Sequence, residues 1–438
     1  MESPIIDIFC SKITPRVKYT LDLIFRDTLN IDYHLTNDKE VFGTSNRAKF
    51  SYDYQPISDE IFIYSSGLLF EKGVVDQNVS VLDWNNTKAI FATHPKYILP
   101  FDPFSASFYM ATRYEEYLPH HRDEHDRFNA PESIAFKKDF LHQPVINIYA
   151  YAIRDLILER YPDFHFPKRK YRFISTIDID NAWAYLEKGI LRTTGAYLKS
   201  LVRLNFDEII ERTKVLFGVL KDPYDTYELQ LDLQKEFNFE LIYFFLLAEY
   251  GTNDRNVPTN SRKLRTLIKS LADYAQTGIH PSYNSNSQPH KLNKELQVLR
   301  QILKRDVFNS RQHFLVLKFP ETYRKLIELD IKNDFTMGYA LKPGFRAGIC
   351  TPYHFYDLDI EQKTSLMIHP FAIMDATMKY YLKTHSDKAM SVITPLINEV
   401  KAVDGDFISL WHNESLSENE IWKGWKPVYK QMIVEACK

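Results

Sequence analysis

The chain has 438 residues, of which 45% are hydrophobic and 14% aromatic, and its formal net charge is −2. This length is too great for one simple core and is sufficient for two domains. The charge balance lacks the basic excess expected of a protein that binds nucleic acid or an anionic membrane. No stretch approaches a membrane span, and the N-terminus opens with an acid rather than a basic signal region, so a soluble, cytoplasmic protein is expected.

Residues 1–165 are predicted to form a small α/β domain with a helical connector. The apolar pattern predicts short strands over 4–9, 31–36, 61–66 and 88–93, and helices over 14–29, 102–118 and 145–161. A polar loop is predicted over 119–133. The Pro-containing basic connector that follows the last helix sets the domain boundary near Phe166.

Residues 166–438 alternate strand-like and helical runs. Strands are predicted over 171–180, 240–247, 277–283, 311–317, 334–339, 365–371 and 406–413, with helices over 261–275, 291–305, 321–329 and 388–403. This alternation predicts a distorted, TIM-like (β/α) barrel of about seven strands, and an open doubly wound sheet is the alternative. No Gly-rich phosphate loop follows any strand, which disfavours a dinucleotide-binding fold.

The run "FISTIDIDNAW" places two acids, Asp178 and Asp180, in an otherwise apolar strand. Residues two apart in a strand share a face. Two neighbouring carboxylates repel each other unless a cation or a shared proton intervenes. Ionisable residues also end other predicted strands, namely His280, Arg311 with His313, and His412. Because catalytic residues of (β/α) barrels lie at the carboxyl ends of strands, the set indicates a site.

In their order along residues 170–438, the motifs "TIDID", "GIHPSYN", "RQHF" and "ISLWHN" resemble the polysaccharide deacetylase family, the NodB homology domain. That family has a distorted (β/α) barrel and removes acetyl groups from N-acetylated sugars with a divalent metal. The resemblance implies that Asp178 is the general base, oriented by Arg311, and that His412 is the general acid. It also implies that Asp180 and His280 are metal ligands, most simply of zinc.

The sequence departs from the family where the second motif should supply another histidine, because Asn284 stands at that position. Three interpretations remain open. Asn284 or a water completes the metal site, His313 supplies the third ligand, or no metal binds and the protein is inactive as a hydrolase. For His313 a structural role is the simpler interpretation, and salt-bridged acids or core histidines remain alternatives for the other motif residues.

Several residues near the motifs are candidates for substrate binding. Trp183, Tyr283 and Trp411 have rings that stack on sugars, although large aromatic residues are core by default. Arg346 is either a substrate-binding cation or a structural ion-pair partner.

The first domain and the loops 336–350 and 369–378 resemble a subgroup of the family found in bacterial exopolysaccharide gene clusters. The expected function is metal-dependent deacetylation of an N-acetylated saccharide in cell-surface or exopolysaccharide metabolism. The alternative is a catalytically inactive saccharide-binding or scaffolding protein.

Overall fold

Two separate sheets organise the chain in the computed structural model, which describes residues 4–419 and 421–438. The first sheet is parallel, with the order β2-β1-β3-β4, and comprises β1 (Ile5–Phe9), β2 (Asp32–Thr36), β3 (Lys49–Asp53) and β4 (Ile61–Tyr64). β3 is not among the predicted strands. Its polar residues Lys49, Ser51 and Asp53 weaken the apolar signal from which strands are predicted.

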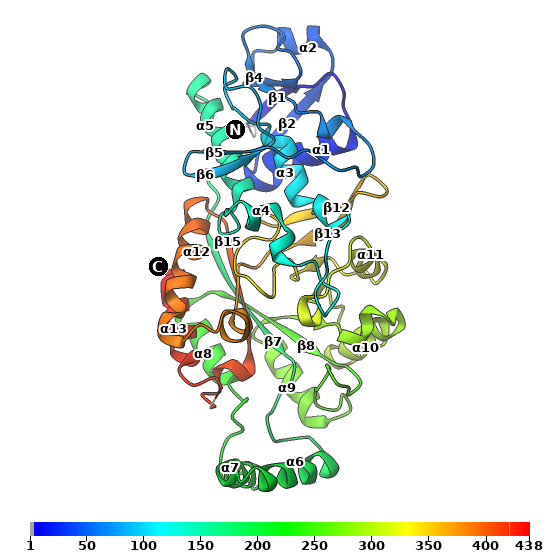
Figure 1. Cartoon of the computed structure of the whole chain (residues 1–438), viewed down its shortest axis with the longest axis vertical. Helices are drawn as coiled ribbons and strands as arrows, with labels where there is room; N and C mark the ends of the chain where they lie inside the picture. Colours follow the sequence, from blue (N-terminus) through cyan, green and yellow to red (C-terminus); the bar gives the residue numbers. More distant parts are fainter. Residues whose placement is uncertain (1–3, 420) are drawn as a thin grey trace.

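Helices and a small hairpin pack around the first sheet (Figure 1). The helices are α1 (Pro15–Leu21), which continues as a π-helical turn over Asp22–Thr28, α2 (Lys39–Thr44), α3 (Pro103–Ala111), α4 (Ile134–Lys137) and α5 (Val145–Arg160). The hairpin consists of β5 (Val81–Trp84) and β6 (Thr87–Ile90). α1 begins where it does because the Thr14 side chain accepts a hydrogen bond from Val17 N, and Pro15 has the backbone angle that a first helical turn needs.

The second sheet has nine strands in the order β12-β13-β11-β10-β9-β8-β7-β15-β14. The strands are β7 (Arg172–Ile179), β8 (Glu240–Leu246), β9 (Gln276–His280), β10 (Asn309–Ser310), β11 (Asn333–Asp334), β12 (Tyr353–Asp357), β13 (Gln362–Ile368), β14 (Ile373–Met374) and β15 (Asp406–His412). All neighbours are parallel except β12 and β13. The mixed α/β class agrees with the prediction.

The seven-strand barrel, in contrast, is not what the described residues form. The sheet stays open, because its end strands β12 and β14 pair only with β13 and β15 in the described chain. β10, β11 and β14 contain two residues each, so few ladder hydrogen bonds hold this part of the sheet. The predicted strand over 311–317 is also wrong: β10 ends at Ser310, and a 3₁₀ turn occupies His313–Leu315.

Helices flank the second sheet, and one pair of them projects away from it. Those along the sheet are α8 (Tyr227–Phe237), α9 (Arg262–Ala272), α10 (Pro289–Leu303), α11 (Glu321–Glu328), α12 (Ala389–Ala402) and α13 (Trp425–Cys437). α6 (Ile190–Val202) and α7 (Phe206–Leu216) lie at the end of the molecule opposite the first sheet (Figure 1). The sequence pattern predicts no element there. None of the helices in the described ranges combines the length and apolarity needed to cross a bilayer.

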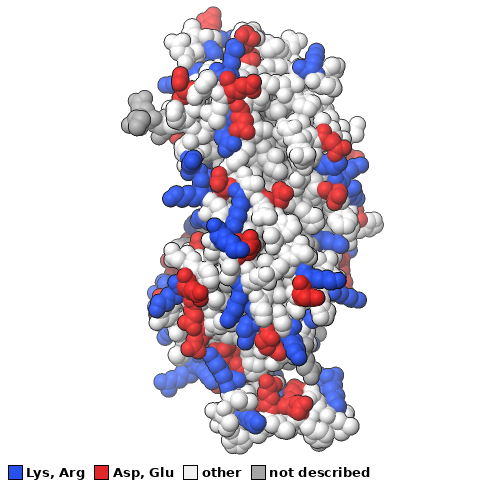
Figure 2. Space-filling view, turned by 90° about the vertical axis from the view of Figure 1, so that its left-hand side faces the viewer, with Lys and Arg blue, Asp and Glu red and all other residues white. Residues whose placement is uncertain are grey.

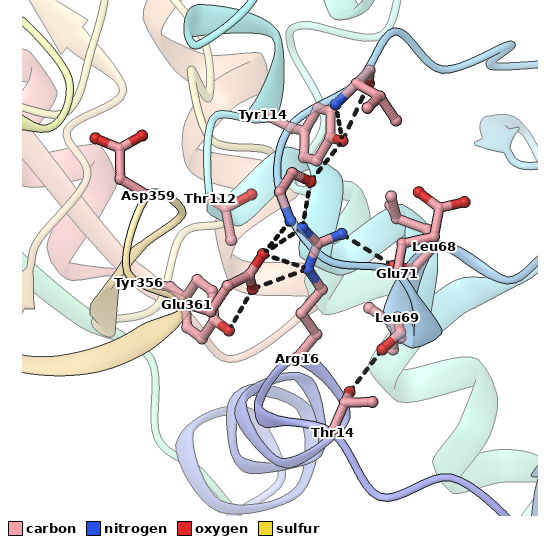
Figure 3. Close-up of polar contacts among 12 residues, drawn as sticks. Thr14, Arg16, Leu68, Leu69, Glu71, Thr112, Tyr114, Tyr356, Asp359 and Glu361 are labelled. Carbon is pink, nitrogen blue, oxygen red and sulfur yellow. Dashed lines mark hydrogen bonds and ion pairs between the residues drawn. The ribbon is translucent and has the colours of Figure 1, made fainter.

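A buried arginine joins the N-terminal unit to the second sheet (Figure 3). The Arg16 side chain, on α1, donates from Nε to Glu361 Oε2 at 2.9 Å and from Nη1 to the Leu68 carbonyl at 3.0 Å. Glu361 lies in the turn between β12 and β13 and also accepts a hydrogen bond from Tyr356 at 2.8 Å. Further along β13, Lys363 Nζ lies 3.0 Å from Asp22 Oδ2. Polar contacts therefore hold the first unit against the β12–β13 hairpin.

Candidate metal and catalytic site

Three strand ends bring one carboxylate and two imidazoles together. Asp180 follows β7, His280 ends β9, and His313 lies three residues after the end of β10. Asp180 Oδ1 lies 3.2 Å from His280 Nε2, and Asp180 Oδ2 lies 3.4 Å from His313 Nε2. Candidate ligand atoms of these residues all lie within 4.8 Å of one another. Parallel strands end on the same edge of a sheet, which explains why residues so far apart in sequence converge.

The contact that His280 makes through Nδ1 leaves its other ring nitrogen, Nε2, without a proton to donate. Nδ1 of His280 lies 2.5 Å from the Arg311 carbonyl oxygen, which only accepts, so Nδ1 carries the proton of the neutral ring. Nε2 then presents a lone pair to Asp180 Oδ1, and that oxygen accepts no hydrogen bond from the described residues. Two acceptors that face each other fit a bound cation.

His313 is oriented in a similar way by a second carboxylate. Its Nδ1 lies 2.9 Å from Asp254 Oδ1, which directs Nε2 towards Asp180. Burial lowers the pKa of His313, but Asp180 and Asp254 together raise it to about 9. Burial would raise the pKa of Asp180, yet the charge of His313 holds it well below its usual range. A histidine that bonds a carboxylate through one nitrogen and faces a site with the other is typical of a metal ligand.

The donor set fits a catalytic zinc site, which commonly has three protein ligands from histidine and carboxylate. Asn284, the first alternative for the third ligand, lies outside this cluster. Its backbone N–H lies 3.4 Å from Asp254 Oδ2, in a 3₁₀ turn over Tyr283–Asn286 that Ser282 caps. Its side-chain nitrogen lies beside Gly251, and Asn284 does not line the cavity that contains the cluster. Asn284 is therefore not part of this cluster, in which His313 is the third candidate ligand.

Arg311 and His313 do not share a strand, as the predicted strand over 311–317 required, although both side chains reach the site. His313 belongs to a turn in which Phe314 and Leu315 have φ angles of 57° and 55°. These left-handed residues reverse the chain locally. His313 therefore reaches Asp180 because of the turn and not because of strand alternation.

Asp178 is held by a different partner from Asp180. The fully buried Arg311 donates from Nη1 to Asp178 Oδ1 at 3.0 Å and to Thr176 Oγ1 at 2.6 Å. Its Nε donates to the Phe335 carbonyl at 3.0 Å. Burial lowers the pKa of Arg311, and Asp178 partly offsets this, but a guanidinium remains charged at any ordinary pH. Asp178 Oδ2 lies 3.6 Å from His280 Nε2, so it borders the metal cluster.

His412, at the end of β15, is a further titratable group at this edge. Its Nδ1 lies 2.8 Å from Asp375 Oδ1, and its backbone N–H donates to Asp375 Oδ2 at 2.8 Å. Burial lowers the pKa of His412, but Asp375, assisted by Asp180 and Asp178, raises it well above its ordinary value. These carboxylates favour the protonated ring, whose Nε2 lies 3.9 Å from Asp180 Oδ2.

One cavity of about 210 Å³ joins these groups. The site residues, several apolar side chains and the acid Glu414 line it. The complete lining is Arg127, Asp178, Asp180, His280, Gln312, His313, Phe314, Leu315, Ala340, Met374, Ala376, Tyr380, Tyr381, Leu410, His412, Glu414 and Trp422. Glu414 is one of the groups that sequence reasoning missed. Burial raises its pKa to about 7, although His412 opposes the rise. Asp254 and Asp375 were also missed, although Asp375 lies in the loop 369–378, because each acts through a partner distant in sequence.

The residues expected to bind substrate, Trp183, Tyr283, Arg346 and Trp411, do not line this cavity. Trp411 is completely buried against Trp425 and Tyr429, on the strand face opposite His412, and Trp183 is also core. Arg346 is buried and makes an ion pair with Glu116 at 2.6 Å. This contact fits the structural ion-pair role rather than the substrate-binding role.

Tyr283 packs on Phe314, with a ring-centroid distance of 5.2 Å. Phe314 lines the cavity, and Tyr283 lies behind it. The aromatic lining comes instead from Phe314, Tyr380, Tyr381 and Trp422.

Comparison with known proteins gives a family match for one part of the chain and a distant likeness for another. Residues 6–162 match a "Family of unknown function (DUF7033)". No curated protein matches the chain. A candidate polysaccharide deacetylase from Mycobacterium smegmatis is 14% identical, with a TM-score of 0.40, and the match covers 62% of this chain and 86% of that one.

Two other solved structures are less similar. A polysaccharide deacetylase from Bacillus cereus is 10% identical, with a TM-score of 0.29, over 61% of this chain and 88% of that one. A CE4 family pseudoenzyme from Bacillus anthracis is 11% identical, with a TM-score of 0.27, over 60% and 62% of the two chains. A likeness this distant does not identify the chemistry of the site.

Proposed function

We propose that this protein is a metal-dependent hydrolase that removes acetyl groups from an N-acetylated saccharide in cell-surface or exopolysaccharide metabolism. The observation that carries the proposal is the Asp180–His280–His313 cluster, which shares one cavity with an arginine-held acid, Asp178, and a carboxylate-held histidine, His412. The order of the sequence motifs supports the same reaction class.

Amide hydrolysis needs a base for the attacking water and an acid for the leaving amine. Arg311 occupies one oxygen of Asp178, which leaves Oδ2 beside the cluster to accept a proton from water. Protonated His412 faces the same space and donates a proton to the amine nitrogen as the C–N bond breaks. A divalent ion held by the three ligands would lower the pKa of water and polarise the acetyl carbonyl.

The aromatic lining suits the sugar ring of such a substrate. Tyr380, Tyr381 and Trp422 line the same cavity as Glu414 and His412. Aromatic faces stack against the apolar faces of rings, and the acid accepts hydrogen bonds from hydroxyl groups. The second candidate, a non-catalytic saccharide-binding protein, is favoured only by the missing imidazole at Asn284. The position of His313 supplies an imidazole from another element.

The test compares metal content and acetate release from N-acetylated oligosaccharides. The wild type is expected to hold about one divalent ion, and His280→Ala and His313→Ala to lose it. Asn284→Ala is the matched control and should keep it, because its side chain lies outside the cluster. Equal, near-zero metal in all four proteins would overturn the proposal.

The base is tested separately with Asp178→Asn. This variant should keep the metal and lose about 10² to 10⁴ in rate, which is the usual contribution of acid–base catalysis. Unchanged turnover would exclude Asp178 as the base, and loss of metal would place it among the ligands.

A further inference from the structure

The α6–α7 hairpin exposes the side chains that a surface helix normally buries. Leu191, Ile190, Val202 and Phe217 are 91%, 85%, 83% and 81% exposed. The other large apolar side chains exposed between residues 190 and 220 are Leu198, Leu201, Leu204, Phe206, Ile210, Leu216, Val219 and Leu220. On α6, Leu191, Leu198 and Val202 are separated by seven and four residues, so they share one face.

Apart from the buried Val215 on α7, the face that packs inward is polar. Ser200 is buried and donates to Glu208 on α7 at 2.9 Å, and Arg212 pairs with the same Glu208. Tyr197 and Thr213 join the helices through their hydroxyl groups, 2.8 Å apart. A helix pair on an ordinary protein surface has the opposite arrangement, with apolar residues inside and polar residues outside. The inversion indicates that the apolar face meets another apolar phase.

Unpaired basic residues border this apolar face. The segment 190–221 has six Lys and Arg against three Asp and Glu, a net charge of +3 in a chain whose total is −2. Lys199, Arg203 and Lys214 are exposed and make no ion pair with any residue of the described chain. Their long side chains can extend past an apolar surface to reach anionic groups.

The position of the hairpin leaves this face unobstructed. α6 and α7 lie across the far end of an elongated molecule, roughly perpendicular to its long axis (Figure 1). In the space-filling view, the lower edge is mostly white, with charged side chains just above it (Figure 2). With 13 and 11 residues, the helices are too short to span a bilayer but can lie in its interface.

We propose that the α6–α7 hairpin docks this protein on an anionic lipid surface, with its apolar side chains in the acyl boundary and Lys199, Arg203 and Lys214 at the headgroups. An amphipathic helix with basic flanks has this binding mode. A second copy of the chain is a poorer occupant, because a symmetric contact would place the same net positive charge on both sides. The hairpin follows β7, the strand that carries Asp178 and leads into Asp180, so docking anchors the chain close to that strand end.

Vesicle flotation of the full-length chain tests the proposal. Binding is expected to vesicles of equal phosphatidylcholine and phosphatidylglycerol, to weaken on phosphatidylcholine alone, and to weaken at high salt. Leu191→Glu with Val202→Glu should reduce partitioning by at least about tenfold, since burying even one such side chain is worth that much. Lys199→Glu with Arg203→Glu should lower binding to the anionic vesicles only.

The control carries the same chemical change at the other end of the molecule. Val41→Glu with Ile98→Glu alters two apolar side chains that are 48% and 51% exposed and lie outside the hairpin, and it should bind like the wild type. Absence of binding to anionic vesicles, or equal binding by the hairpin variant and the wild type, overturns the proposal. A dimer in sedimentation that only the hairpin variant loses, without vesicle binding, would assign the face to a second copy instead.

Discussion

At the scale of single residues, the site separates two acids that are adjacent on one strand face. Asp178 is held by Arg311, and Asp180 by the imidazoles of His280 and His313. Asp178 has a positively charged partner, and Asp180 faces the imidazoles of the proposed metal site. These separate partners offset the repulsion between the two carboxylates. The two acids can therefore have different tasks, one as base and one as ligand.

Asp254 acts on the proposed metal site only through His313. Asp254→Asn is expected to weaken zinc affinity by about 10- to 100-fold, as is usual when the carboxylate partner of a ligand histidine is removed. Zinc titration against a competing chelator measures the change, and thermal unfolding is followed in parallel. Asp222→Asn is the matched control, because Asp222 is a buried acid that accepts backbone hydrogen bonds distant from the ligands. Equal affinity in all three proteins would show that Asp254 has only a structural role.

At the scale of elements, β9 can lie close to its neighbours because residue 278 has no side chain. A Cβ atom at Gly278 would lie 2.5 Å from the Phe244 ring on β8 and 2.7 Å from the Asn309 carbonyl on β10. These strands bring His280 and Arg311 together at the edge of the sheet. The close approach of three strands is therefore a condition for the site.

Gly278→Ala is expected to lower the free energy of unfolding by about 1–3 kcal/mol, the usual cost of overpacking a core. Chemical denaturation measures the loss. Gly195→Ala, in α6, is the control: nothing lies within 4 Å of its added methyl group, so it should keep or slightly increase stability. Equal stability of the two variants would contradict the packing argument.

His369, directly after β13, gives the sheet a dependence on pH. Burial lowers its pKa to about 4, and the ring stacks on Phe335 at 4.4 Å while Nε2 lies 3.0 Å from Asn333 Oδ1. The unfolded chain takes up a proton near pH 6.5. Between about pH 6.5 and pH 4 the unfolded state therefore binds more protons, and stability falls as the pH falls.

His369→Gln should remove this loss, which we expect to be about 3 kcal/mol over the whole pH range. Denaturation at several pH values between these limits measures it. A wild type and a variant with parallel stability profiles would exclude His369 as the cause.

At the scale of the whole molecule, the contact between Arg16 and Glu361 connects the two sheet-containing units. Arg16→Met leaves a half-buried Glu361 without its partner, so we expect a loss of about 2–4 kcal/mol. Thermal unfolding and limited proteolysis of the N-terminal unit measure the effect. Arg26→Met is the control, because the Arg26 side chain is 48% exposed and its ion pairs lie at the surface. A loss of the same size in both variants would refute a specific role for the buried contact.

The sequence by itself determined those features that depend on local period and residue type. Strand alternation placed Asp178 and Asp180 on one face, and the pattern of apolar residues predicted most helices and longer strands of both sheets. The motifs also indicated that His280, Arg311 and His412 belong to one site. In the structure His280 and His412 line one cavity, and Arg311 pairs with Asp178 in the wall of that cavity.

Only the tertiary structure decided the features that depend on contacts between distant segments. Asp254 approaches His313 across 59 residues, and Asp375 approaches His412 across 37, with no spacing that a local pattern could show. The core position of Trp411, the structural ion pair of Arg346, the open sheet and the outward apolar face of α6–α7 were likewise decided by packing. The type of a residue limits what its side chain can bind. Its actual partner is decided only when burial of apolar surface brings segments distant in sequence together.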